Sequence, residues 1–372
     1  MLTSKQGTRY WRALTAALYF LASCAFAIPE LNDLLPRANN KPLESIEGVK
    51  THYGSVEVES GVRLRTLISR SQTAKKPLHP LLFTQWVSCD SVELRSGSGG
   101  ILGALARESN LALVRVERAG AGDSQGPVCS ELDYNTEVAH YVTAFEQLLE
   151  DPSIDASKVY VLGMSLGSTT APLVAERLQA KGFDIEAVMV QGGGALTHLE
   201  RMINFDRIYL ERRPDVVASE DIHQQMNLRI AFQTEYLAKG RHPDDIAKDS
   251  TDMLAIRNDV RGLGETDHYG RPFAWHQQAA KQNFLAAWAA LNAKVLVIFN
   301  EFEQFEVQHG HQLIVDTINL KRAGTATLII QPQLDHSSWF YPSKLDAYAD
   351  VDGESRSNVT ASAMLNWLKL IQ

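Results

Sequence analysis

The sequence has 372 residues, of which 45% are hydrophobic, and a formal net charge of −8 at pH 7. A chain of this length and hydrophobicity can bury one large core plus a smaller accessory unit, which fits one α/β domain with an insertion better than two independent domains. The acidic balance argues against nucleic acid as a partner, because phosphate binding needs clustered Lys and Arg.

The N-terminal residues 1–27 are typical of a signal sequence. Three basic residues precede an apolar run from Ala13 to Ala27 that carries no charge, and this run is shorter than the roughly 20 residues of a membrane span. Two processing outcomes stay open, because residues 25–27 suit a signal peptidase whereas residues 21–24 resemble a bacterial lipobox that ends at Cys24. The sequence therefore predicts an exported protein, which is periplasmic, secreted or anchored in the bacterial envelope through a lipid on Cys24.

The next elements alternate between strand and helix patterns. After a polar segment, residues 28–54, apolar and polar residues alternate from Ser55 to Arg70 around Ser60-Gly61, which predicts a β-hairpin. Short apolar runs follow, typical of strands that are covered on both faces of a parallel sheet, at 81–83, 111–116, 158–162, 187–190, 294–299 and 325–330. Helical patterns lie between most of them, and residues 358–371 are predicted to form the last helix. This alternation predicts an α/β fold with a mainly parallel central sheet and helices on both faces.

One stretch, residues 197–291, interrupts the alternation. It shows no convincing strand, and its helix-compatible sequence is punctuated by Pro214, Pro243 and the glycines at 262 and 264. We interpret it as a helical cap inserted between a first core part, residues 55–196, and a second, residues 292–372. Aromatic residues at helical spacing belong more often to a core than to a substrate wall, and here they are Phe273, Trp275, Phe284 and Trp288.

Ser165 is the predicted nucleophile. The strand at 158–162 leads into Gly-Met-Ser-Leu-Gly at 163–167 and then into helix-forming sequence, which is the context of a nucleophile elbow. The small residues relieve crowding at the turn, and the Leu166 amide would point toward a bound carbonyl oxygen at the helix N-terminus. The pattern alone is weak, because Gly-Asp-Ser-Gln-Gly at 122–126 matches it equally well. No helix pattern follows Ser124 for several residues, so the context favours Ser165.

A serine nucleophile needs a base, and His336 is the predicted base. Of the eleven histidines, His336 alone combines a preceding apolar strand with a following short loop and C-terminal helix. His309 and His311 form a His-x-His pattern that could bind a metal, but exposed positions on a helix are the simpler interpretation.

The carboxylate that orients the base is expected in the loop after the strand 294–299. Glu301, Glu303 and Glu306 are the candidates there. Glu303 is preferred because it lies where a Gly-x-x-Asp pattern would place the acid, and Glu301 is the second choice.

Three cysteines are present, and Cys24 lies inside the predicted signal sequence. Cys89 and Cys129 would remain in the folded protein, and an even pair in an exported protein favours a disulfide.

The order of these motifs resembles that of the α/β-hydrolase superfamily, particularly its capped peptidase-like and esterase-like bacterial members, over roughly residues 55–372. Such enzymes place an oxyanion loop after the third strand, a Gly-Asp-Ser loop after the fourth and the nucleophile after the fifth. The acid follows the seventh strand and the histidine the eighth. The corresponding positions in this chain are residues 85–87, residues 122–124, Ser165, Glu303 and His336.

This chain departs from the superfamily pattern at two places. Gln85-Trp86 stands where the oxyanion loop usually has His-Gly, so the amide that joins Leu166 in the oxyanion hole is expected from Val87, with Trp86 as the alternative. The acid is a glutamate, and Asn300 replaces the usual glycine before it.

The resemblance implies a serine hydrolase that cleaves an ester or amide bond through an acyl-enzyme on Ser165, with a carboxylic ester slightly favoured and a small molecule or peptide as substrate. The alternatives are an aminopeptidase-like serine peptidase, an acyltransferase and a catalytically silent binding protein of the same fold. It also implies that the loops of Cys89 and Cys129 emerge at the same edge of the sheet, where a disulfide would brace the oxyanion loop. No cofactor or metal is expected, and nothing in the sequence indicates an oligomeric state.

Overall fold

The computed structural model describes residues 42–94, 96–213, 217–349 and 351–372. The predicted signal sequence, including Cys24, lies outside these residues. Within the described ranges, no helix is long and apolar enough to cross a membrane.

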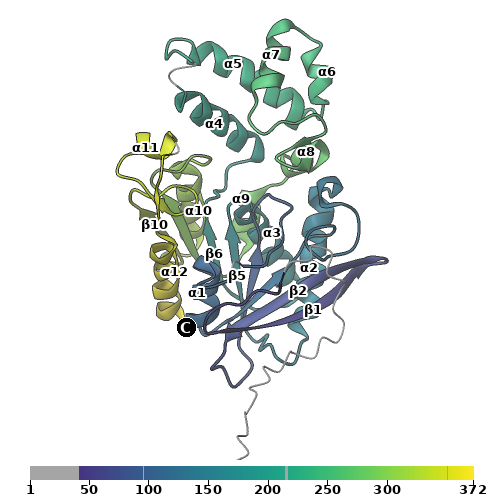
Figure 1. The fold of residues 1–372 in the computed structure, drawn as a ribbon, viewed down its shortest axis with the longest axis vertical. Coiled ribbons are helices and arrows are strands. Elements are labelled where there is room, and N and C mark those ends of the chain that lie inside the picture. The colour runs from purple at the N-terminus through teal and green to yellow at the C-terminus, as the bar shows by residue number, and fades with distance from the viewer. Residues whose placement is uncertain (1–41, 95, 214–216, 350) are drawn as a thin grey trace, which may run out of the picture. The chain divides into compact units, whose positions relative to one another are not determined.

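An eight-stranded sheet forms the centre of the described region (Figure 1). In chain order its strands are β1 (Val49–Glu59), β2 (Val62–Ser71), β3 (Pro80–Thr84), β4 (Ala112–Val116), β5 (Val159–Met164), β6 (Ile185–Gln191), β9 (Lys294–Asn300) and β10 (Ala326–Gln331). Their spatial order is β1-β2-β4-β3-β5-β6-β9-β10. β2 pairs antiparallel with β1 and β4, and the other neighbours are parallel. The predicted hairpin and the predicted apolar strands are confirmed.

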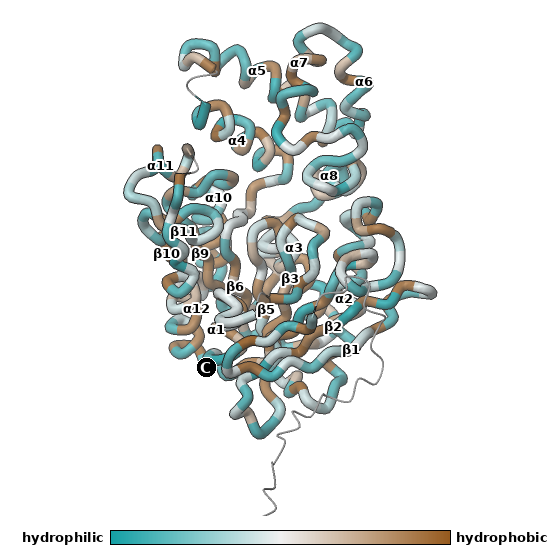
Figure 2. The backbone as a smooth tube through the Cα atoms, viewed as in Figure 1, coloured by the Kyte–Doolittle hydropathy of each residue, from teal (hydrophilic) through white to brown (hydrophobic). Residues whose placement is uncertain are grey.

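Helices cover both faces of the sheet, because successive strand residues point to opposite sides. In β3, Leu81 and Phe83 belong to one buried cluster and Leu82 to the other. The first cluster is closed by α1 (Gly100–Glu108) and the predicted last helix, α12 (Ser357–Ile371). The second is closed by α2 (Tyr134–Leu149), α3 (Gly167–Ala180) and α10 (Gln308–Lys321). Figure 2 shows the hydrophobic stretches gathered in the central strands.

The segment between β6 and β9 is helical, as predicted, apart from one small hairpin. It contains α4 (His198–Glu211), α5 (Ile222–Gln233), the π-helical turn η2 (Thr234–Ala238), α6 (Pro243–Ala247), α7 (Thr251–Asp259), α8 (Phe273–Ala279) and α9 (Phe284–Ala290). The expectation that this segment holds no strand is wrong, since β7 (Asp267–His268) pairs with β8 (Arg271–Pro272). Strands of two residues are too short to show an alternating pattern.

The two parts of this segment pack into different buried clusters. Its first part encloses a buried cluster of its own around Phe232, Tyr236 and Leu237. Trp275 and Trp288, in contrast, belong to the larger core cluster that α2, α3 and α10 close. The predicted limits of the insertion, 197–291, therefore include α9 and much of α8, whose buried side chains pack on the core. We use the name cap for residues 197–273.

Candidate active site

Ser165 lies at the sharp turn between β5 and α3. Its φ of 53° falls in the left-handed region that residues other than glycine seldom occupy. A Cβ on Gly167 would lie 2.1 Å from Thr84 O, and one on Gly163 would lie 2.5 Å from Gly167 O, so the close backbone approach requires both glycines. The Ser165 amide donates to Gln191 O at 2.8 Å. The turn therefore holds the Ser165 side chain at the carboxyl edge of the sheet.

Ser124, in the second Gly-x-Ser-x-Gly stretch, has a different environment. Its Oγ accepts a hydrogen bond from Arg65 N at 2.8 Å and donates one to Glu117 O at 3.2 Å. The next regular element is only a short 3-10 turn, η1 (Cys129–Glu131). Ser124 thus ties the loop after β4 to strand β2, and its hydroxyl is engaged by the backbone.

His336 joins Ser165 to Glu303. Its Nε2 lies 2.9 Å from Ser165 Oγ, and its Nδ1 lies 2.8 and 2.7 Å from the two carboxylate oxygens of Glu303. An ionised carboxylate only accepts hydrogen bonds, so Nδ1 carries a proton, and in the neutral ring Nε2 is free to accept one. The exposed Glu301 instead accepts from Gln333 N at 2.8 Å. The structure therefore brings together the nucleophile, the base and the preferred acid that the sequence predicts.

The electrostatics of this chain favour proton transfer to His336. Burial alone would raise the pKa of Glu303, but the charge and hydrogen bond of His336 and the Phe305 N–H outweigh it and lower the pKa below its usual value. Burial alone would lower the pKa of His336, but Glu303 outweighs it and raises the pKa above its usual value. The carboxylate thus stabilises the imidazolium that forms when Nε2 takes a proton.

Polar residues at the ends of β6 and β9 hold the loop of His336. Gln191 Nε2 donates to His336 O at 2.9 Å, and Asn300 Nδ2 donates to Asp335 O at 2.5 Å. Gly192 leaves room for the imidazole, because a Cβ there would lie 2.8 Å from His336 Cε1. From the sequence, Asn300 is only a departure from the superfamily pattern, and no role is predicted for Gln191 or Gly192. Their one signal in the sequence is their position at the carboxyl ends of apolar strands.

Arg118 holds the backbone of the predicted oxyanion loop. Its Nη2 donates to Gln85 O at 3.1 Å and to Trp86 O at 2.6 Å, and its Nη1 donates to Ser88 O at 2.7 Å. The described peptide bonds are trans, so the N–H of Val87 points away from the Trp86 carbonyl and from Arg118. The sequence analysis missed Arg118, because only the folded chain shows that three carbonyls converge on it.

Val87 and Trp86, the two predicted oxyanion residues of this loop, differ in position. Val87 lines the cavity beside Ser165 and Leu166. The Trp86 indole is turned to its own loop, where Nε1 donates to Ser88 Oγ at 2.8 Å. The geometry therefore favours the Val87 amide as the partner of Leu166.

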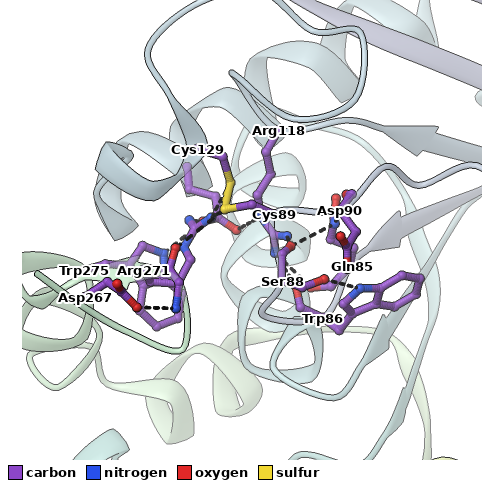
Figure 3. Close-up of a disulfide and its surroundings, with 12 residues drawn as sticks. Gln85, Trp86, Ser88, Cys89, Asp90, Arg118, Cys129, Asp267, Arg271 and Trp275 are labelled. Carbon is purple, nitrogen blue, oxygen red and sulfur yellow. Dashed lines mark hydrogen bonds and ion pairs between the residues drawn. A yellow bond between two sulfur atoms is a disulfide. The ribbon is translucent and has the colours of Figure 1, made fainter. Parts of the chain in front are cut away.

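The disulfide predicted between Cys89 and Cys129 is present, with Cα atoms 5.7 Å apart (Figure 3). It joins the loop after β3 to η1. Arg271 of the cap lies beside it, with Nη1 2.8 Å from Cys129 Sγ and 3.3 Å from Cys89 Sγ. The bridge therefore lies where the cap meets the oxyanion loop.

Glu137 connects the disulfide region to the oxyanion loop. It forms a buried ion pair with Arg271 and accepts hydrogen bonds from Arg118 Nε at 2.6 Å and Trp275 Nε1 at 2.9 Å. Burial raises the pKa of Glu137, but the two arginines outweigh it and lower the pKa overall. Arg118 is thus held by a carboxylate that Arg271 of the cap also contacts.

A cavity of about 340 Å³ opens beside Ser165 and His336. Its walls come from the cap, which contributes Met202, Phe205 and Tyr269, and from Phe305 in the loop after β9. The four aromatic residues predicted to belong to a core, Phe273, Trp275, Phe284 and Trp288, are buried and do not line this cavity. The wall is mostly apolar, and its charged groups outside the triad are Arg201 and Glu306.

The two histidines of the His-x-His pattern lie on α10. His309 is exposed, but His311 is fully buried, so the expectation of two exposed positions is wrong for His311. A helical period of 3.6 turns neighbours two positions apart by about 200°, which places them on different faces. In the part of the chain that the structure describes, no group of three His, Cys, Asp or Glu side chains is arranged to hold a metal ion.

No protein-family model and no curated protein sequence matches this chain. Solved structures do share its fold. A hypothetical protein from Pseudomonas aeruginosa aligns with a TM-score of 0.53 at 11% identity, over 92% of this chain and 100% of that chain. Proline iminopeptidase from Mycobacterium smegmatis aligns with a TM-score of 0.51 at 14% identity, over 86% and 98%.

A longer protein shares the fold as well. An acylaminoacyl peptidase from Pyrococcus horikoshii aligns with a TM-score of 0.50 at 10% identity, over 85% of this chain and 41% of its own. The eight-stranded, mainly parallel sheet, its strand order and these similarities lead to one conclusion. The chain has the α/β-hydrolase fold.

Proposed function

We propose that this protein is a serine hydrolase that cleaves an ester or amide bond through an acyl-enzyme on Ser165. The observation that carries the proposal is the continuous set of hydrogen bonds from Ser165 through His336 to Glu303. His336 Nε2 takes the hydroxyl proton while Oγ forms a bond to the substrate carbonyl carbon. Glu303 keeps the proton on Nδ1 and stabilises the imidazolium.

The negative charge that develops on the carbonyl oxygen would be held by the amides of Leu166 and Val87. Both residues line the cavity, and Leu166 lies at the N-terminus of α3, where the helix dipole favours negative charge. The intermediate then breaks its bond to the leaving oxygen or nitrogen, which takes the proton from His336. A water molecule, activated by the same histidine, releases the acyl group and restores Ser165.

The cavity supports a carboxylic ester as substrate more than an aminoacyl amide. A peptidase that recognises a free amino terminus needs an unpaired carboxylate for the ammonium group. In the cavity wall Glu306 is already paired with Arg201, whose Nε lies 2.7 Å from Glu306 Oε1. The remaining wall is mostly apolar, which suits a neutral acyl group.

The test is a panel of 4-nitrophenyl esters and aminoacyl 4-nitroanilides, with Ser165→Ala as the blank. We expect ester cleavage by the wild type and none above background by Ser165→Ala. Cleavage of the anilides alone would favour the peptidase alternative, and release of 4-nitrophenol only when an acceptor alcohol is present would favour an acyltransferase. If neither class of substrate reacts and a fluorophosphonate does not label Ser165, the protein is a silent member of the fold.

A further inference from the structure

We propose that the ion pair between Arg201 and Glu306 determines the specificity of this cavity. The pair cancels its own charge, so the cavity accepts an uncharged, apolar acyl group of medium size and rejects acyl groups that carry an ammonium or a carboxylate. This inference rests on the proposed hydrolase function and adds the class of acyl group.

The two partners come from different parts of the fold. Arg201 lies on α4 of the cap, and Glu306 lies in the loop after β9, three residues beyond Glu303. Glu306 Oε1 accepts from Arg201 Nε at 2.7 Å and also from Nη2. The side chains are only 8% and 4% exposed. Both residues line the cavity that holds Ser165 and His336, so the pair is part of the substrate wall.

Three further titratable groups line the cavity, His198 and Tyr269 in the cap and His276 in α8. Burial raises the pKa of the Tyr269 hydroxyl, which keeps it uncharged. His276 Nε2 lies 2.8 Å from His268 O, which only accepts, so this nitrogen carries a proton. Because the neutral ring then accepts at Nδ1, it is His198 Nε2, 3.0 Å away, that donates. Burial lowers the pKa of both histidines well below the usual value, and the neighbouring charged or imidazole groups lower it further.

The rest of the wall is apolar and tightly stacked. The rings of Phe205 and Phe305 stack with centroids 5.2 Å apart, and Phe305 contacts the His336 ring with centroids 4.8 Å apart. Apart from the triad, the wall therefore presents aromatic and aliphatic groups, the hydroxyls of Tyr269 and Ser337, two imidazoles and one internally compensated ion pair.

A charged acyl group would find no free counter-charge in this wall. The pair uses Glu306 Oε1 with Arg201 Nε and Nη2, whereas Arg201 Nη1 is buried without a hydrogen-bond partner. A charged acyl group that drew one of the two partners to itself would leave the other buried charge uncompensated, which is strongly unfavourable. A cavity of about 340 Å³ lies at the small end of the range of roughly 300–1,000 Å³ that small-molecule sites cover. A medium-length acyl chain or a small arylalkanoyl group has this size.

The experiment compares three 4-nitrophenyl esters with the same six-carbon chain: hexanoyl, 2-aminohexanoyl and adipoyl. Spontaneous hydrolysis is subtracted with Ser165→Ala. We expect the wild type to favour hexanoyl over each charged ester by about 100-fold in kcat/KM, since the charged chains bury an unpaired group. A wild type that hydrolyses either charged ester as fast as the hexanoyl ester overturns the inference.

Three variants test whether the mutual compensation of the two charges sets the preference. Glu306→Gln frees Arg201 and should raise the adipoyl-to-hexanoyl ratio at least about tenfold, and Arg201→Met frees Glu306 and should raise the aminohexanoyl-to-hexanoyl ratio by a similar factor. The matched control is the double variant R201M/E306Q, which leaves no charge unpaired and should keep the wild-type order of substrates. Replacing a buried ion pair with neutral groups of similar size often preserves stability, so this control is expected to fold.

The pKa of His336 depends on burial and on the charges of Glu303 and Glu306, so a substitution at Glu306 also changes the base. Substrate ratios are therefore compared within each variant, where this change acts on all three esters. Folded single variants whose ratios stay at the wild-type values overturn the inference, and so does a double variant that favours a charged ester. The proposed function fails separately, if the wild type and Ser165→Ala release 4-nitrophenol from the hexanoyl ester at the same rate.

Discussion

The turns at Ser165 and Ser124 share the pattern Gly-x-Ser-x-Gly, yet the folded chain uses them differently. Ser165 has a φ of 53°, α3 begins two residues later, and its hydroxyl lies 2.9 Å from an imidazole nitrogen. Ser124 is not followed by an α-helix until α2, and its hydroxyl bonds to the backbone of β2 and of the residue that follows β4. One hydroxyl lies beside a proton acceptor and the other joins two segments.

The carboxylates near the two turns differ in the same way. Glu303 contacts His336, a group that can gain and lose a proton. Glu117 and Asp123, beside Ser124, form ion pairs with the buried Arg65, which stays charged. The pattern therefore specifies only a tight turn with small residues. Whether the serine hydroxyl meets a proton acceptor depends on the helix that follows the turn and on the side chain that another loop brings to it.

The strongest test of this comparison removes each hydroxyl in turn. Ser165→Ala should reduce ester turnover on the order of 10⁶-fold, because the three groups act as a unit, and should abolish fluorophosphonate labelling. Ser124→Ala should keep labelling and turnover but lose about 1–3 kcal/mol of unfolding free energy, since Arg65 N loses its acceptor. Turnover and urea unfolding are measured on both variants. Labelling that survives Ser165→Ala and disappears in Ser124→Ala would reverse the comparison.

The second test replaces the carboxylates beside the two serines, Glu303 and Glu117, with glutamine. Glu303→Gln should lower kcat by about 10⁴-fold with little loss of folding, because the amide no longer fixes the imidazole tautomer. Glu117→Gln should leave kcat near the wild-type value and reduce stability by about 1–3 kcal/mol, since the buried Arg65 loses a charged partner 3.0 Å from its Nε. Glu301→Gln is the control for position, and a larger loss of kcat there than in Glu303→Gln would move the acid by two residues.

The pH profile is the second readout of the same variants. Catalysis needs neutral His336, and Glu303 raises the pKa of this histidine against the effect of burial. Wild-type kcat/KM should therefore fall as the pH drops through a midpoint above the ordinary histidine value of about 6.5. Glu303→Gln removes the raising influence, so its residual activity should persist to lower pH. An unchanged midpoint would mean that Glu303 does not act on His336.

The smallest expected effect concerns two buried arginines, Arg118 beside the predicted oxyanion loop and Arg65 beside the turn of Ser124. Arg118→Met should lower kcat by about 10- to 100-fold with little change in KM, because three carbonyls of the predicted oxyanion loop lose the guanidinium that binds them. Glu137 keeps Arg271 as a partner, so the variant is expected to fold. Arg65→Lys is the control, and it should lower the unfolding free energy while leaving kcat near the wild-type value. Affinity for a trifluoromethyl ketone separates the roles, since a purely structural Arg118 would leave that affinity unchanged in the folded variant.

Much of the fold was predictable because its signals are local. The alternation from Ser55 to Arg70 and the short apolar runs predicted the hairpin and the parallel strands that the structure contains. The strand–turn–helix context around Ser165 also lies within some twenty residues of sequence, so it distinguished this turn from that of Ser124. The hairpin of β7 and β8 was missed because two-residue strands carry no period.

The sequence by itself therefore determined the order of strands and helices, the position of the tight turn at Ser165 and the small set of acids and bases near strand ends. These features depend on backbone conformation and on the burial period of each segment. The folded chain decided which carboxylate meets His336. Three glutamates lie close together in one loop, namely Glu301, Glu303 and Glu306, and their side chains point to different partners. It also decided that Arg118 binds three carbonyls of the loop after β3 and that Arg201 pairs with Glu306. Such contacts join segments up to 105 residues apart, and their geometry depends on how helices and strands pack, which no local pattern of residues encodes.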